Sequence, residues 1–264
     1  MKIILVGSLP AAASSRVATN VRSLIRLIAK RGDNFAIRAC RRMQSGLTPI
    51  DEIVSTCLHE AEVSRELQAD RNRLVVFREP GVESDFEVKI PHLIHQLSTS
   101  YRVDFYREIL NNVDLVVGVG GELGLLRLAM VCEQSGKPIA FLPGSGGTAD
   151  LLWEEYFKKS SQLRRVSPED INFLKGTPRA DAENPTYADD VYQRLKLVHE
   201  AVGKALRRVH LWSPSTVTVP DLISELGRLS VGLWVTLLSL LASIVSFSYW
   251  LGTLQLLKKL SNAH

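Results

Sequence analysis

Residues 115–124 read LVVGVGGELG, and this stretch indicates the fold class of the chain. It opens with an apolar run, Leu115 to Val117, of the kind that forms strands buried on both faces of a parallel sheet. Gly120 and Gly121 then make a turn, and residues 122–134 have the pattern of a helix. Strand, glycine turn and helix in direct succession begin a βαβ unit, so the stretch predicts an α/β domain.

The same succession repeats along much of the chain. Further apolar runs predict strands at residues 3–6, 35–37, 74–77 and 139–142. Helical patterns follow at residues 17–28, 48–61, 101–110 and 148–158. The second of these is expected to start with Thr48 as its cap and Pro49 in its first turn. Residues 82–100 have no clear pattern. The alternation of strands and helices predicts a Rossmann-like, doubly wound parallel sheet.

The composition limits the class of protein. The chain has 264 residues, of which 45% are hydrophobic and 23% charged, so most of it is expected to be globular. Its net charge is +4 with both signs interleaved, which argues against nucleic acid as a partner. Cys40, Cys57 and Cys132 form no CxxC pair, and we expect reduced thiols in a cytosolic domain. His92 and His95 have no evident third ligand, so no metal or cofactor is expected.

The sequence changes character after residue 165, which we take as the end of a first domain at residues 1–165. Residues 166–186 are rich in Pro, Asp, Asn and Thr and are expected to form a loop. Residues 187–210 predict an amphipathic coupling helix, followed by a linker at residues 211–227 and a transmembrane segment at residues 228–257. The apolar stripe of the coupling helix consists of Val191, Leu195, Val198, Val202, Leu206 and Val209.

The predicted transmembrane segment has no Asp, Glu, Lys, Arg or His between Leu229 and Leu257. Crossing a bilayer takes about 20 apolar residues, so this stretch is long enough to cross once. The alternative is a buried core helix or a soluble oligomer interface, although soluble helices rarely run this long without a charge. The N-terminus has no signal-peptide pattern, so we expect a single-pass protein of the inner (cytoplasmic) membrane with its N-terminal domain in the cytoplasm.

Serines within the same segment predict association between copies. Ser239, Ser243 and Ser246 are spaced by four and three residues, which places them near one face of a helix. Small hydroxyl residues on one stripe allow close helix–helix contact in lipid, so a homo-oligomer is expected. Serine that is merely tolerated in the span is the alternative.

Three glycine-bearing turns follow predicted strands. They are Gly7-Ser8, residues 118–124 and residues 143–148, the last reading PGSGGT. Backbone N–H groups in such turns can close on an anion, and the N-terminus of the following helix favours negative charge. Parallel sheets bind ligands at this edge. The turns therefore predict a nucleotide or nucleotide-sugar site, with tight turns that bind no ligand as the alternative.

The combination of these turns resembles the SLOG superfamily, which includes the Smf/DprA proteins and the Lonely Guy (LOG) phosphoribohydrolases. Over roughly residues 1–160 the sequence looks like the STALD branch, a sensor domain found in antiviral systems such as Thoeris. This resemblance implies binding of a cyclic ADP-ribose isomer or a related nucleotide second messenger, made by a TIR-domain enzyme as functional partner.

The resemblance also implies roles for individual residues. Gly7 and Ser8 would contact the ligand from the first turn, and Glu122 would contact its ribose or base. A basic residue upstream would meet the ligand's charge, with Arg102, Arg107 and Lys89 as candidates. The residues implied to line the phosphates are Gly120, Gly121, Gly144, Ser145, Gly146, Gly147 and Thr148.

A LOG-type hydrolase is the alternative within the same superfamily. These enzymes resemble one another in the motif PGGxGTxxE, whose glutamate assists glycosidic cleavage. Here the corresponding position holds Leu151, Asp150 lies one residue early, and Glu154 lies one turn beyond. A catalytic carboxylate must come within hydrogen-bond reach of its substrate, so no catalytic residue is expected and sensing is favoured.

Together these features predict a ligand-gated membrane effector. Binding of the second messenger would rearrange the oligomer, and the spans in the lipid bilayer would then disrupt or open the membrane. The alternatives are a membrane-anchored LOG-like enzyme and a membrane-tethered scaffold that binds no nucleotide.

Overall fold

Six parallel strands form the centre of the computed structural model. The model describes residues 1–10, 15–39, 46–78, 80, 87–98, 102–121, 123–160, 162–163 and 166–203. Its parallel strands are β1 (Lys2–Pro10), β2 (Asn34–Ala39), β4 (Leu74–Arg78), β5 (Leu93–Gln96), β6 (Leu115–Gly120) and β7 (Ile139–Phe141). They lie in the order β5-β4-β2-β1-β6-β7, and a short strand, β3 (Leu47–Pro49), pairs antiparallel with β1. The sheet is therefore of the Rossmann-like α/β type.

The two central strands explain why the chain adopts this order. Residues 3–6 of β1 and residues 115–117 of β6 are buried, because apolar side chains on both faces are covered by helices. Ile3 pairs with Leu115 and Ser8 with Gly120, so the two strands run in step to their carboxyl ends. From β1 the chain builds outward through β2 to β5, whereas β6 and β7 lie on the other side. The direction in which the chain adds strands therefore reverses between β1 and β6. Open parallel sheets bind ligands at the carboxyl ends of the strands at such a topological switch point.

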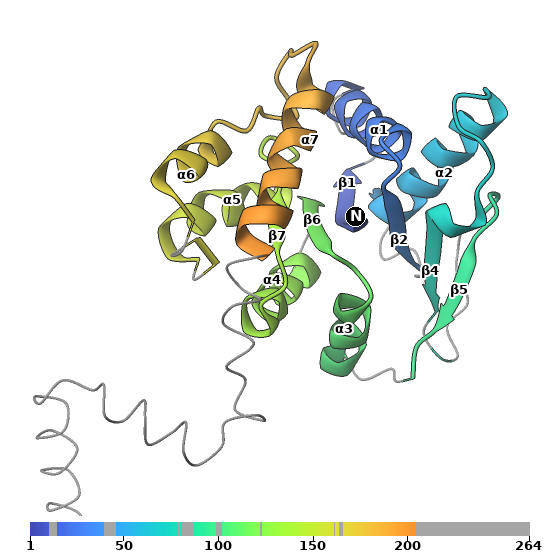
Figure 1. The fold of residues 1–264 in the computed structure, drawn as a ribbon, viewed down its shortest axis with the longest axis horizontal. Coiled ribbons are helices and arrows are strands. Elements are labelled where there is room, and N and C mark those ends of the chain that lie inside the picture. The colour runs from blue at the N-terminus through green and yellow to red at the C-terminus, as the bar shows by residue number, and fades with distance from the viewer. Residues whose placement is uncertain are drawn as a thin grey trace, which may run out of the picture. The chain divides into compact units, whose positions relative to one another are not determined.

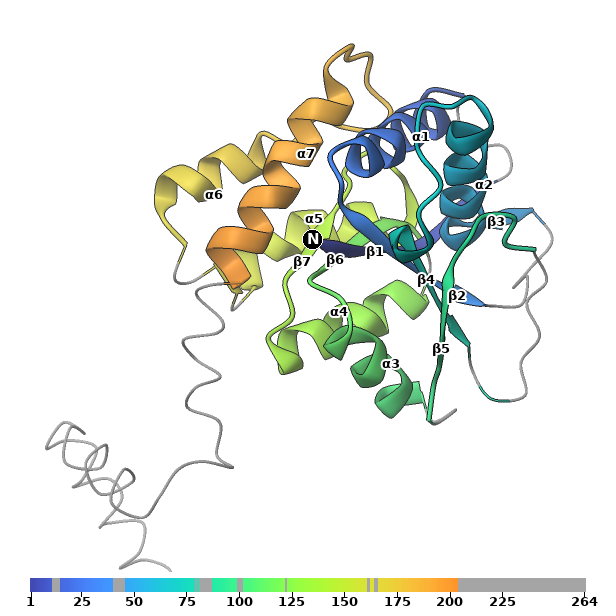
Figure 2. The ribbon, with the colours of Figure 1, turned by 45° about the vertical axis from the view of Figure 1, so that its right-hand side comes forward.

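Helices cover both faces of the sheet (Figures 1 and 2). On one face lie α1 (Ser15–Lys30), α2 (Ile50–Val63) and α7 (Tyr187–Leu197). On the other lie α3 (Arg102–Asn111) and α4 (Leu123–Ser135). Helix α5 (Gly147–Lys159) packs on β6 and β7, and α6 (Pro168–Lys175) contacts α7. A 3-10 turn, η1 (Arg71–Arg73), leads into β4.

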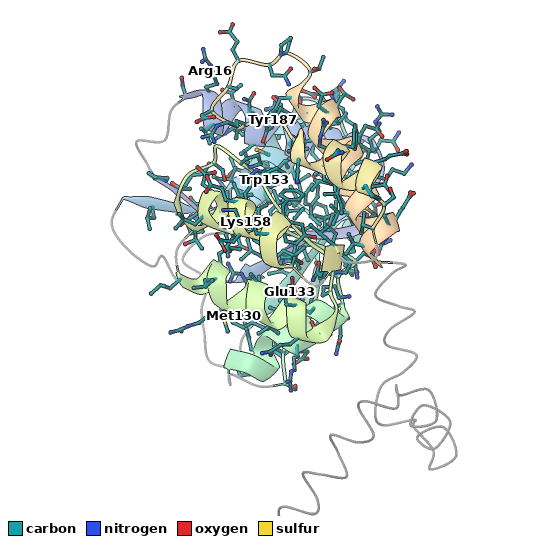
Figure 3. The ribbon with its side chains drawn as sticks, turned by 90° about the vertical axis from the view of Figure 1, so that its left-hand side faces the viewer. Arg16, Met130, Glu133, Trp153, Lys158 and Tyr187 are labelled. Carbon is teal, nitrogen blue, oxygen red and sulfur yellow. The ribbon has the colours of Figure 1, made fainter. Side chains whose placement is uncertain are left out.

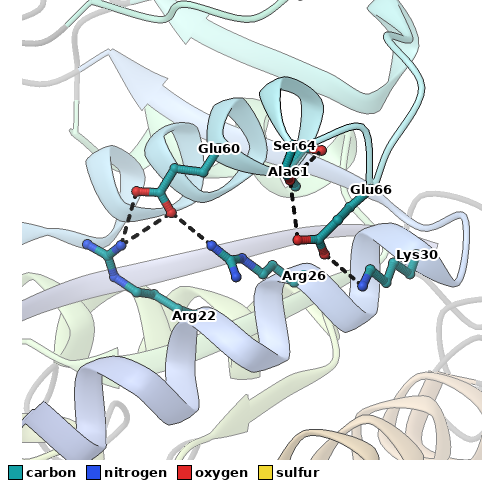
Figure 4. Close-up of polar contacts among 7 residues, drawn as sticks. All are labelled: Arg22, Arg26, Lys30, Glu60, Ala61, Ser64 and Glu66. Carbon is teal, nitrogen blue, oxygen red and sulfur yellow. Dashed lines mark hydrogen bonds and ion pairs between the residues drawn. The ribbon is translucent and has the colours of Figure 1, made fainter.

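Charged side chains join α1 to α2 along their exposed seam (Figure 4). Glu60 accepts from Arg22 Nη1 at 3.4 Å and from Arg26 Nη2 at 3.0 Å, and Lys30 Nζ lies 2.7 Å from Glu66 Oε2. All five side chains are partly exposed, so each pair contributes at most about 1 kcal/mol. The seam therefore adds little to the stability that packing of the two helices on the sheet provides.

The cysteines within the described residues are buried. Cys57 lies beneath the α1–α2 seam and Cys132 on α4, and both are free thiols. Burial raises the pKa of Cys57 to about 11 and that of Cys132 to about 12. Both thiols are therefore protonated and unreactive at neutral pH, as the expectation of reduced, buried cysteines requires. Cys40 lies outside the described residues.

The structure confirms the predicted strands and corrects several boundaries. The expected helix start at Thr48 and Pro49 is wrong: both residues belong to β3, and α2 begins at Ile50. Pro49 has φ −58° and ψ 139°, an extended conformation that cannot continue a helix. The stretch without a pattern holds β5, and the loop expected at residues 166–186 holds α6.

The expected coupling helix begins at Tyr187 and changes from an α-helix to a π-helical turn at Val198. Helix α7 is followed by a π-helical turn at Val198–Val202, and residues from 204 on lie outside the described part. Of the predicted stripe, the described members are all buried: Val191, Leu195, Val198 and Val202. They face α1 and the end of β7, so this stretch of α7 packs on the sheet domain.

The predicted membrane span, residues 228–257, also lies outside the described residues. Within the described part of the chain, no helix is long and apolar enough to cross a bilayer.

Candidate functional site

The turns after β1 and β6 meet at the switch point. Gly121 N–H donates to the Ser8 carbonyl at 2.9 Å, next to the paired residues Ser8 and Gly120. A side chain at Gly120 would overlap the Ser8 carbonyl oxygen, and Gly120 has a φ of +56°. Glycine is therefore required at this position by the contact between the two turns, whether or not a ligand binds.

The turn after β7 joins the same cluster. We call Gly120 and Gly121 the β6 turn, and residues 143–148 the β7 turn. Ser145 is 4% exposed, and its hydroxyl accepts from Gly120 N–H at 2.8 Å and donates to the Leu142 carbonyl at 2.6 Å. Thr148 N–H donates to the Gly121 carbonyl at 3.1 Å. The hydroxyl of Ser145 thus holds the two turns together, and its contact with a ligand stays a prediction.

The β7 turn keeps backbone donors available, and the β6 turn does not. Gly146 is the N-cap of α5 and has no capping side chain. No described residue accepts a hydrogen bond from the N–H of Gly146 or Gly147. The space beside Gly146 is open, with no atom within 4 Å of where a side chain would start. Gly146 is half-buried and Gly147 is exposed, and unpaired N–H groups at an accessible helix N-terminus favour an anion such as a phosphate.

The first turn of α5 carries one carboxylate, and it is already in use. Asp150 Oδ1 accepts from Gly144 N–H at 2.6 Å, and this hydrogen bond joins the β7 turn to the first turn of α5. Leu151 stands where LOG enzymes carry glutamate, and its side chain is 69% exposed. Glu154 is exposed one turn further along. The described residues of α5 therefore bring no uncommitted carboxylate to the LOG position.

The three predicted basic residues lie on α3 and before β5. Lys89 is exposed and precedes β5, which places it toward the amino-terminal edge of the parallel sheet. Arg107 is exposed in the middle of α3. Arg102 begins α3, but its side chain lies outside the described part, as does Glu122 as a whole. The structure thus leaves the roles implied for Arg102 and Glu122 as predictions.

An arginine that the sequence did not single out lies beside the β7 turn. We call residues 176–186, which connect α6 to α7, the return loop. It folds back so that Ala180 N–H donates to the Pro143 carbonyl at 2.6 Å, and Asn20 Nδ2 on α1 donates to the Ala180 carbonyl at 2.8 Å. Arg179 and Asp181, on either side of Ala180, both lie against Gly144. No local signal could reveal this contact, because it joins segments far apart in the sequence.

Metal ligands do not cluster in the described part of the chain: no group of three His, Cys, Asp or Glu residues could hold an ion there. The two histidines of the predicted pair have other contacts. His92 Nδ1 lies 2.8 Å from the Ile90 carbonyl, and His95 Nε2 lies 3.4 Å from Glu108 Oε1.

Comparison with known proteins finds similarity among solved structures. No family model matches the sequence, and neither does any curated protein. Among solved structures, the X-ray structure of TM1055, a target of the Northeast Structural Genomics Consortium, has 21% sequence identity to this chain. The similarity covers 64% of this chain and 88% of that chain, with a TM-score of 0.43. The Rossmann-like assignment rests on the strand order and register of this sheet itself.

Proposed function

We propose that this chain is a membrane-bound sensor that binds a phosphate-bearing nucleotide at the β7 turn. The observation that carries the proposal is the pair of unpartnered N–H groups at Gly146 and Gly147, next to the switch point of the sheet. Phosphate oxygens accept such hydrogen bonds, and each charge-assisted bond contributes about 1.5–3 kcal/mol. The resemblance of the turns to the SLOG superfamily favours a cyclic ADP-ribose isomer as the natural ligand, made by a TIR-domain enzyme.

Sensing is favoured over hydrolysis by the residues around the turn. A LOG-like cleavage would need a carboxylate where Leu151 presents an aliphatic side chain to solvent. The neighbouring Asp150 is already bonded to Gly144 N–H. A ligand held by backbone donors, with no uncommitted carboxylate at the LOG position, is retained rather than cleaved.

The output of the sensor is proposed to be membrane disruption in antiviral defence. Helix α7 begins directly after the return loop and precedes residues 228–257 in the sequence, and these residues are apolar and uncharged from 229 on. A shift from a mostly closed to a mostly open assembly needs about 5 kcal/mol of differential binding, which a few phosphate contacts can supply.

A second copy of the chain is the proposed partner for one exposed apolar face. Leu123, Leu126 and Met130 lie at spacings of three and four on α4, and all are exposed. Figure 3 shows Met130 on α4, and its side chain is 57% exposed. Because Leu123 lies two residues after the β6 turn, association there would connect ligand binding to assembly. Met130→Glu should shift the ligand-bound oligomer toward monomer in analytical ultracentrifugation; an unchanged mass distribution would exclude this face.

Calorimetric titration of the full-length, detergent-solubilised protein tests the function. We expect saturable binding of ADP-ribose, tighter binding of a cyclic ADP-ribose isomer, and weaker binding of AMP and NAD. Chromatography of the titrated mixtures should recover each nucleotide intact. Release of free base or ribose phosphate would establish the LOG-like alternative, and failure of the whole panel to bind would contradict the proposal.

A further inference from the structure

The return loop holds an ion pair at the edge of the candidate site. Arg179 Nε lies 3.0 Å from Asp181 Oδ1, and Arg179 Nη2 lies 3.0 Å from Asp181 Oδ2. This is the two-bond fork by which arginine recognises carboxylates and phosphates alike. The side chains of Arg179 and Asp181 are 57% and 45% exposed, so the pair is open to exchange with a dissolved anion.

The ion pair is fixed against the β7 turn. Asp181 Oδ1 occupies the space where a side chain at Gly144 would start, with Arg179 Cβ and the Ala180 N–H close by. The hydrogen bond from Ala180 N–H to the Pro143 carbonyl anchors the loop in this position. A carboxylate of the protein itself is therefore held beside the turn whose N–H groups have no partner.

The ion pair favours the charged forms of both side chains. The bonds to Asp181 raise the pKa of Arg179, and the negative charges of Asp150 and Glu154 raise it further. The same bonds from Arg179 lower the pKa of Asp181. Asp181 and Arg179 are thus both ionised at neutral pH, as an exchange of anions at Arg179 requires.

A buried hydroxyl at the start of α7 senses the charge of Asp181. Tyr187, the first residue of α7, is 1% exposed, and its hydroxyl makes no hydrogen bond to any described residue. Burial raises the pKa of this hydroxyl, and the nearby charge of Asp181 raises it further. Figure 3 shows Tyr187 at the start of α7. Buried hydroxyls normally donate a hydrogen bond, so the Tyr187 hydroxyl can bind an acceptor that moves beside it.

We propose that Asp181 is a built-in competitor for the anionic group of the ligand, and that exchange at Arg179 is what α7 detects. In the free protein Arg179 is paired with Asp181. When a phosphate-bearing ligand binds at the β7 turn, its phosphate replaces Asp181 as the partner of Arg179. The released carboxylate of Asp181 then accepts from the Tyr187 hydroxyl, which changes the start of α7. This inference rests on the proposed function and names the residues that recognise the charge of the ligand.

Titration of full-length variants with ADP-ribose tests the exchange. Asp181→Asn removes the competing charge at constant size, so its affinity for ADP-ribose should rise about five- to tenfold. Arg179→Ala should lower the affinity at least about tenfold, and Arg179→Lys, which keeps the charge but not the fork, should fall in between. Glu183→Gln is the matched control: Glu183 belongs to the same loop but pairs with Arg16, at 3.3 Å, and its affinity should equal that of the wild type.

The outcomes separate this inference from the proposed function. Wild-type binding that neither Asp181→Asn nor Arg179→Ala alters would overturn the exchange and leave the nucleotide site standing. Absence of ADP-ribose binding in the wild type and in Asp181→Asn would overturn both. Equal melting temperatures of the variants without ligand would show that differences in affinity do not come from misfolding.

The role of Tyr187 has its own readout. Tyr187→Phe removes the donor that stabilises released Asp181, so ADP-ribose affinity should fall about three- to fivefold. The free protein should be no less stable than the wild type, because the hydroxyl has no partner to lose. Unchanged affinity in Tyr187→Phe would overturn the connection to α7.

Discussion

The β6 turn and the β7 turn look alike in sequence and differ in what their backbone donors do. Gly120 N–H is bonded to Ser145 Oγ and Gly121 N–H to the Ser8 carbonyl, so the β6 turn has used its donors within the protein. Gly146 and Gly147 in the β7 turn have no acceptor among the described residues. A glycine-rich turn thus identifies a tight bend, whereas the partners of its N–H groups decide whether it can bind an anion.

The largest expected effect comes from Gly120→Ala. Its methyl group would overlap the Ser8 carbonyl, and neither backbone can retreat without breaking the pairing of β1 with β6. The free energy of unfolding should fall by more than about 3 kcal/mol in urea denaturation. Gly124→Ala is the control, because the space beside Gly124 is open and alanine favours a helix, giving a gain of about 0.5–1 kcal/mol. A loss below about 0.5 kcal/mol for Gly120→Ala would remove the structural role of the β6 turn.

Ser145→Ala should have the second largest effect on stability. It leaves the buried N–H of Gly120 without its acceptor, which costs about 1–3 kcal/mol. Nucleotide affinity, measured by titration of the folded variant, should stay within about twofold of the wild type, since this hydroxyl is committed to the protein. A large loss of affinity at full stability would mean that Ser145 contacts the ligand after all.

Gly146→Ala should lower affinity as well as stability. Alanine tolerates the φ of 85° and ψ of −179° at this position poorly, which costs about 1–3 kcal/mol, but its methyl group meets no protein atom. It would instead project into the space where a ligand approaches, so ADP-ribose affinity should fall at least about tenfold. Unaltered affinity in Gly146→Ala would place the ligand elsewhere on the sheet.

The smallest effect is expected from Asp150→Asn. Asparagine can still accept from Gly144 N–H but without the charge, so stability should fall by less than about 1 kcal/mol. Asp150→Ala, which removes the acceptor, should cost about 1–2 kcal/mol. Equal stability of the two variants would show that Asp150 does not hold the β7 turn closed.

The sheet was largely predictable from sequence where its strands are buried. Runs such as residues 3–6 and 115–117 identify strands because both faces are covered. Strand β5 escaped prediction because it lies at the edge of the sheet, where Leu93 and Ile94 are exposed and leave no buried pattern. Helix α6 was hidden by the polar composition around it, although Ser167 caps it by accepting from Asp170 N–H.

The candidate site was predictable as a place but not as a set of contacts. Parallel strands bring Ser8, Gly120 and the β7 turn to one edge, and this follows from topology alone. The inward turn of the Ser145 hydroxyl and the approach of Arg179 to Gly144 depend on tertiary packing between distant segments. Periodicity and local motifs do not reveal such contacts. The basic residues proposed from the sequence therefore precede the β6 turn in the chain and do not include Arg179.

Hydrogen exchange measured by mass spectrometry on the full-length protein, with and without saturating ADP-ribose, tests the central claim most directly. The amides of the β6 turn are already bonded, so their exchange should change little when ligand is added. The amides of Gly146 and Gly147 gain acceptors on binding, so peptides covering residues 143–149 should exchange markedly more slowly. Protection confined to other segments, or no protection at all, would contradict a phosphate site at the β7 turn.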